Sequence, residues 1–156
     1  MRAACVFMLF ILILIFNGCS SLALRPADFS WPVEVVLKPD AKGNVQEARY
    51  QISFNVKALL FEELQDSVNV TKHALHILRD NAGFYFITAK SFKNVYVFAQ
   101  GDGMLKLEKK ILINEKGLEA PAFNQKTPYI YLINENKESE APIILTKDGI
   151  KEGGKK

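Results

Sequence analysis

The feature that most constrains the fold is an alternation of apolar and polar residues that begins at Ala48. Apolar side chains occupy every second position from Ala48 to Val56 in the segment ARYQISFNV, and polar ones fill most positions between them. Successive side chains of a β-strand point to opposite faces, so this spacing predicts a strand with one buried and one solvated face. A helix would instead distribute the same apolar residues around its axis.

Shorter stretches of similar character recur along the chain, separated by turns rich in Gly, Asn and Asp. They predict further strands at 33–38, 73–79, 84–88, 95–99, 104–113, 129–134 and 143–146. The segment 59–70 is compatible with either a short helix or a loop, and 121–128 reads as a loop. No strands alternate with long helices, which disfavours a parallel sheet. We therefore expect an all-β fold: a single antiparallel β-sandwich-like domain, with a small β-barrel as the alternative.

Length and composition set the domain limits. The chain has 156 residues, which leaves room for one domain once the N-terminus is set aside. We expect the β domain at 31–147 and a disordered tail at 148–156, because the last residues contain too little apolar content to hold a structure. The net charge of +3 comes from 20 basic and 17 acidic residues of mixed order. This mixture argues against nucleic acid as a partner, since nucleic acid requires a concentrated basic face.

The N-terminus has the three parts of a secretory signal peptide. Arg2 provides a positive charge, and fourteen apolar residues follow from Ala3 to Phe16. As a helix this run would extend about 21 Å, which is too short for the roughly 30 Å core of a bilayer. Small and polar residues come next, so we predict a signal peptide at 1–18.

The residues FNGC at the end of this segment resemble the lipobox of bacterial lipoproteins. Gly18 fits the small residue that precedes the modified cysteine in that motif, whereas Phe16 and Asn17 depart from the usual residues. The resemblance implies that Cys19 is acylated and becomes the new N-terminus, with 19–30 as lipidated cysteine and tether. It also implies residence in the cell envelope, with the outer membrane favoured over the inner one. Secretion after cleavage near Ala23, or an uncleaved anchor, are the alternatives.

The two cysteines are consistent with this interpretation. Cys5 lies inside the apolar run and would be removed with it, so Cys19 would be the single cysteine of the mature chain. A lone thiol in an oxidising compartment cannot form an intramolecular disulfide, and acylation would account for its presence.

No set of polar residues forms a recognised catalytic or metal-binding motif. His73 and His76 lack a third metal ligand of the usual kind nearby. The turn Gly101-Asp102-Gly103 lacks the further ligands of a calcium loop. The chain has two acidic clusters: one is Glu62, Glu63 and Asp66, and the other is Glu135, Glu138 and Glu140. Both are more simply explained as solvated surface than as paired catalytic carboxylates. The sequon that starts at Asn69 is of a kind expected by chance. We therefore predict no catalytic residue, no cofactor, no metal and no enzyme activity.

Two further groups of residues bear on binding. The first group is a set of lysines in or near predicted strands: Lys90, Lys93, Lys106, Lys109 and Lys110. On strand edges they would discourage edge-to-edge aggregation. The alternative is that they contact an acidic partner or lipid head groups. Aromatic residues crowd one stretch and are expected mainly in the core: Phe84, Tyr85, Phe86, Phe92, Tyr96 and Phe98.

These observations favour three functions in order. The first is a membrane lipoprotein, held by acylated Cys19, that acts as a non-catalytic interaction or accessory module for an envelope protein. The second is a carrier of an apolar small molecule or lipid, and the third, least favoured, is a hydrolase. A pocket of a few hundred Å³ would favour the second over the first.

Overall fold

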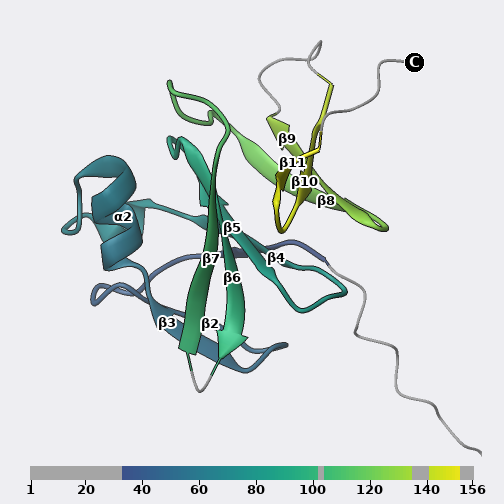
Figure 1. The fold of residues 1–156 in the computed structure, drawn as a ribbon. Coiled ribbons are helices and arrows are strands. Elements are labelled where there is room, and N and C mark those ends of the chain that lie inside the picture. Colours follow the sequence, from purple (N-terminus) through teal and green to yellow (C-terminus); the bar gives the residue numbers. More distant parts are fainter. Residues whose placement is uncertain (1–32, 102–103, 135–140, 152–156) are drawn as a thin grey trace, which may run out of the picture.

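The computed structural model describes residues 33–101, 104–134 and 141–151, and it shows an all-β domain with one α-helix (Figure 1). Its elements in chain order are β1 (Val35–Leu37), β2 (Asn44–Glu47), β3 (Ile52–Asn55), α2 (Lys57–Leu64), the 3₁₀ turn η1 (Val70–Lys72), β4 (Leu75–Arg79), β5 (Tyr85–Ala89), β6 (Asn94–Gly101), β7 (Met104–Leu112), β8 (Pro121–Lys126), β9 (Tyr129–Asn134), β10 (Ile143–Thr146) and β11 (Gly149–Ile150).

The strands form three antiparallel sheets. A five-stranded sheet has the order β1-β4-β5-β6-β7, a four-stranded sheet has the order β11-β10-β9-β8, and β2 pairs with β3 in a hairpin. In the described ranges the five-stranded sheet is open, with β1 and β7 at its two edges. The predicted antiparallel, sandwich-like fold is therefore confirmed, and the sheet does not close as the barrel alternative requires.

The five-stranded sheet is apolar on both faces. One face packs against the β2–β3 hairpin and α2, around buried side chains such as Leu60, Ile77 and Tyr85. The other face packs against the four-stranded sheet, around Leu78, Phe86 and residues of β8, β9 and β10. This double coverage explains why all five residues of β5 are buried.

The segment with the clearest alternation does not form a continuous strand. The chain turns at Ala48–Gln51, where Gln51 has a φ of 53°, and β3 begins only at Ile52. Tyr50 lies in this turn, yet its ring packs edge-on against Tyr85 at a centroid distance of 5.8 Å. The prediction of one continuous strand from Ala48 to Val56 was therefore wrong, because Tyr50 continues the apolar pattern from within a turn.

Two other boundaries differ from the prediction. Residues 121–126 form β8 and not a loop, and Pro121 is its first residue, where the missing N–H of proline is tolerated. Phe123 points into the core at 5% exposure, which supplies the driving force for this strand. At the C-terminal end, β11 lies beyond the predicted domain limit at residue 147, because Gly149 pairs with Thr146 of β10. The rest of the predicted tail, 152–156, lies outside the described residues.

The segment 59–70 resolves into a helix followed by a loop. α2 contains good helix formers and buries Leu60 completely, and it ends where Gln65 adopts a left-handed conformation. Among the described residues, no helix has the length and apolar character needed to cross a membrane.

Candidate functional site

An apolar cavity of about 470 Å³ lies between the α2–β3 segment and the end of the β6–β7 hairpin. Its polar lining consists of Ser53, Asn55 and Glu62. The remaining lining is aliphatic or aromatic, and comprises Phe54, Val56, Ala58, Leu59, Ile87, Tyr96, Phe98, Met104, Leu105 and Leu107. This volume is in the range of sites that hold small molecules or large apolar side chains.

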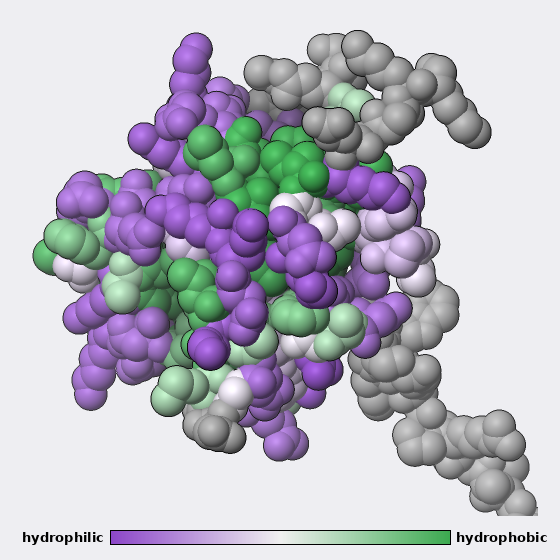
Figure 2. Space-filling model, viewed as in Figure 1, coloured by the Kyte–Doolittle hydropathy of each residue, from purple (hydrophilic) through white to green (hydrophobic). Residues whose placement is uncertain are grey.

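Side chains of the α2–β3 segment and of β7 line the cavity together. Leu59 and Leu105 face it from opposite sides and are only partly buried against the core. At the rim, Leu107 is 49% and Met104 is 68% exposed. Figure 2 shows a largely polar surface on this side of the molecule that is interrupted by apolar areas. Large side chains exposed next to a cavity are typical of a surface that binds something.

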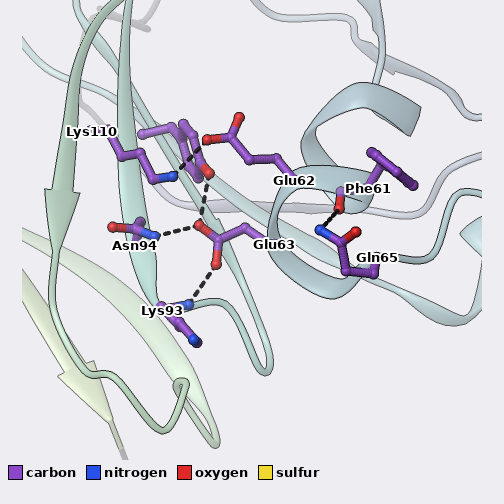
Figure 3. Close-up of polar contacts among 8 residues, drawn as sticks. Phe61, Glu62, Glu63, Gln65, Lys93, Asn94 and Lys110 are labelled. Carbon is purple, nitrogen blue, oxygen red and sulfur yellow. Dashed lines mark hydrogen bonds and ion pairs between the residues drawn. The ribbon is translucent and has the colours of Figure 1, made fainter.

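Glu63 fastens α2, and with it one wall of the cavity, to the five-stranded sheet. Its carboxylate accepts hydrogen bonds from the backbone N–H of Lys93 at 2.7 Å, the amide of Asn94 at 2.6 Å and the hydroxyl of Tyr96 at 2.7 Å. Figure 3 shows Glu63 extending from the helix toward Lys93 and Asn94. All three donors come from the start of β6 or the residue before it, so a single side chain fixes the helix to that strand.

The Tyr96 hydroxyl is kept as a donor by its surroundings. Burial, and then the hydrogen bond to Glu63, raises the pKa of Tyr96 well above its usual value. A tyrosine hydroxyl is protonated at physiological pH in any case, and the raised pKa extends this donor state to higher pH.

The neighbouring Glu62 lies at the rim of the cavity. It accepts a hydrogen bond from Lys110 of β7 at 2.6 Å, and the two side chains are 51% and 42% exposed. The Lys110 ammonium also lies 5.6 Å from the centre of the Tyr96 ring. This ion pair bridges α2 and β7 on the solvent side, where such pairs contribute little to stability.

Asp66, the third member of the predicted acidic cluster, points elsewhere. It accepts hydrogen bonds from the backbone N–H groups of Val68 and Asn69 and from the Asn69 side chain. Those bonds lower the pKa of Asp66 to about 2. The three acidic residues therefore have three separate roles, and the sequon residue Asn69 is engaged in the same loop.

The two histidines line a second cavity of about 570 Å³, together with Lys72, Lys90 and residues of the loop before β8. His76 is held by Glu34, whose Oε1 lies 2.8 Å from the His76 Nδ1 and also accepts the N–H of Phe123. This contact joins β4 to β8 and so links the two larger sheets. No group of three potential metal ligands occurs in the part of the chain that the structure describes.

The lysines do not form one surface. Lys106, Lys109 and Lys110 lie on β7, an edge strand, whereas Lys90 and Lys93 flank the connection between β5 and β6. The location of the first three agrees with the expected role of lysine on sheet edges.

The aromatic residues divide between the two faces of the five-stranded sheet, and most of them belong to the core as predicted. Tyr85, Phe92, Tyr96 and Phe98 pack in one core, and Phe84 and Phe86 in the other. Only Tyr96 and Phe98 of this group reach the cavity.

Other predicted positions lie outside the described residues. These are Cys5 and Cys19 near the N-terminus, Asp102 and Gly103, and the acidic group Glu135, Glu138 and Glu140.

Sequence reasoning missed the residues that form the cavity. Phe54 was assigned to the buried face of a strand, and Leu59 to a segment left between helix and loop. Leu105 and Leu107 are predicted as one face of a strand, but nothing in their pattern indicates that a cavity remains between them and α2. No family model matches this chain, and it has no match among curated proteins or solved structures.

Proposed function

We propose that this protein is a lipoprotein of the cell envelope whose β domain is a non-catalytic binding module for another envelope protein. The volume of the cavity between α2 and β7, about 470 Å³, by itself favours a carrier of a small molecule, and the proposal rests instead on where this cavity opens. It opens at the edge of a sheet, and exposed apolar side chains, Leu107 and Met104, stand at its rim. An apolar side chain of a partner can enter it and bury surface there, as anchor residues do at protein interfaces.

The anchor rests on the sequence. The apolar run and the FNGC motif support acylation of Cys19, with the outer membrane favoured over the inner one and secretion as the alternative. Residues 20–30 would reach at most about 36–40 Å when extended, so the domain would remain near its membrane. Membrane fractionation tests this: Cys19→Ala should leave the membrane fraction or remain unprocessed, and the wild type should carry lipid on Cys19 by intact mass spectrometry. An unmodified chain that begins after Ala23 would refute the anchor.

The proposal is non-catalytic because of how the acidic and histidine side chains are used. Glu63 joins α2 to β6, Asp66 closes a loop, and His76 with Glu34 connects two sheets. Each of these groups is engaged in hydrogen bonds within the domain, and among them His76 also borders the second cavity. General acid–base work requires a group presented to a substrate.

Site-specific photocrosslinking in intact cells tests the binding surface. Benzoylphenylalanine at Leu107 should capture a specific envelope protein. Val36 is the matched control, since it is apolar, 50% exposed where Leu107 is 49% exposed, and lies on β1 at the opposite edge of the same sheet. Equal capture at both positions, or none at Leu107, would contradict the proposal.

A carrier of an apolar small molecule is the second candidate. The cavity volume of about 470 Å³ and its mostly apolar lining support it. Native mass spectrometry of protein extracted from its membrane separates the two: a carrier should retain a defined lipid or small molecule in addition to its acyl chains, whereas an interaction module should not.

A further inference from the structure

The outer edge of β7 is available for pairing. β7 is nine residues long and pairs with β6 on both sides of a bulge at Glu108, and no strand pairs with its other side in the described part of the chain. In the described residues β11 of the four-stranded sheet lies against β7, but it is hydrogen-bonded to β10 and not to β7. An edge of this length presents a row of backbone N–H and C=O groups to an added strand, whereas β1 at the opposite edge has only three residues.

The edge and the cavity are continuous. Leu105 and Leu107 pair with Gln100 and Phe98, so they lie on the face of the sheet that borders the cavity. In a strand added beside β7, every second side chain would point to this same face. Those side chains would lie against Leu105 and Leu107 and extend into the cavity. An extended segment at this edge would therefore need an apolar residue at alternate positions.

The charges on the other face of β7 determine which side chains suit the alternate positions of the added strand that do not face the cavity. Lys106 and Lys109 lie on the opposite face of the strand, since they pair with Ala99 and Val97. Opposite charges in neighbouring strands attract and like charges repel. β7 carries three lysines and Glu108, a net charge of +2 (3 − 1), so a second copy of this chain paired along β7 would bring two net positive edges together. An acidic segment would instead be complementary to them.

We propose that β7 accepts an extended, acidic segment of a partner protein as an additional strand. Apolar side chains on one face of that segment enter the cavity, and acidic side chains on its other face meet Lys106 and Lys109. This inference rests on the proposed function and names the chemistry of the partner.

A peptide binding assay with the full chain in phospholipid nanodiscs tests it. The probe is a fluorescein-labelled peptide of alternating order, Glu-Val-Glu-Leu-Glu-Val-Glu-Leu. The controls are a peptide of the same composition with all four glutamates first, and the alternating peptide with lysine in place of glutamate. Fluorescence anisotropy should show binding of the alternating acidic peptide alone, weakened by salt, and hydrogen exchange of the β7 amides should slow when it is bound.

Matched variants locate the site. The double variant Lys106→Glu with Lys109→Glu should weaken binding at least about tenfold, since it turns two attractions into repulsions. Lys38→Glu with Lys126→Glu makes the same change in net charge at positions after β1 and at the end of β8, neither of which lines the cavity, and should leave affinity unchanged. Leu107→Asp should also abolish binding. Circular dichroism of each variant establishes that it remains folded.

The outcomes separate this inference from the proposed function. Equal binding of the alternating and permuted peptides, or equal loss in both double-lysine variants, would overturn strand addition. If no peptide binds but photoactivatable dodecanoic acid labels the cavity, the carrier alternative replaces it. If the peptides fail while Leu107 still captures a protein in cells, strand addition is wrong and the binding module stands.

Discussion

Replacement of Glu63 by alanine tests how the wall of the cavity is held. The substitution removes an acceptor shared by three donors, two of which lie on residues almost without exposure: Tyr96 at 1% and Asn94 at 7%. Hydrogen bonds to a charged group contribute about 1.5–3 kcal/mol each, and a buried donor left without a partner keeps the cost of its desolvation. The backbone N–H of Lys93 is at the surface and can bind water. Two lost contacts give about 3–6 kcal/mol, which is a large part of the stability of an ordinary domain.

Equilibrium unfolding in urea measures this effect, and the adjacent glutamate is the control. Glu62→Ala changes the same residue type in the same helix, but its ion pair with Lys110 is about half exposed. That pair should contribute about 0–1 kcal/mol, so Glu62→Ala should shift the free energy of unfolding little. Glu63→Ala should in addition weaken binding at the cavity, because α2 would no longer be fixed to β6.

A double-mutant cycle with Tyr96→Phe isolates one of the three contacts. The loss from the double variant should be smaller than the sum of the two single losses by about 1–2 kcal/mol, as expected for residues that share a hydrogen bond. If Glu63→Ala costs no more than Glu62→Ala, the reasoning is refuted, and α2 is held by the packing of its apolar residues, Leu60 above all.

Three further predictions concern the stability of the domain. Gly117→Ala should destabilise the domain more than Gly149→Ala in urea unfolding. Both glycines have positive φ, for which the backbone strain of a substitution costs about 1–3 kcal/mol, but only at Gly117 would the new Cβ also meet a backbone oxygen, at 2.7 Å. Asp66→Asn should lower the free energy of unfolding by its largest amount above about pH 4, and this loss should shrink as the pH falls toward 2. The reason is that the folded-state pKa of Asp66 lies below its ordinary value of 3.8. A loss that does not depend on pH would contradict this. Leu60→Ala should cost about 2–5 kcal/mol by calorimetry, whereas Phe61→Ala, at a position 54% exposed, should cost less than about 1 kcal/mol.

The fold class could be predicted from the sequence because short-range patterns determine it. The strands near 75–79, 85–89 and 129–134 have apolar side chains at spacings that only a sheet buries efficiently. Errors arose where tertiary contacts changed the meaning of a residue. Tyr50 fits the apolar positions of a strand pattern, but it lies in a turn and packs on Tyr85 from there. Residues 121–126 form a strand although half of them are polar, because the ring of Phe123 is buried.

The candidate site was harder to predict for a physical reason. A cavity is the space left between elements, so it depends on where the α2–β3 layer ends relative to β7. Leu59 and Leu107 line the same cavity from two different elements, and the sequence around either residue does not indicate that the other lies nearby. The role of Glu63 was missed for the same reason, since its partners are about thirty positions away along the chain.

The order of strands in the five-stranded sheet has a consequence for how the chain folds. β4, β5, β6 and β7 are neighbours both in the chain and in the sheet, so each pair can form as a hairpin with a short loop to close. β1 is the exception, because Val36 pairs with His76 across forty residues (76 − 36). Local pairings form faster than distant ones, since less chain entropy is lost before contacts are made. We therefore expect pulse-labelled hydrogen exchange to show protection in β4–β7 before β1, so that the first of the described strands is the last to join the sheet.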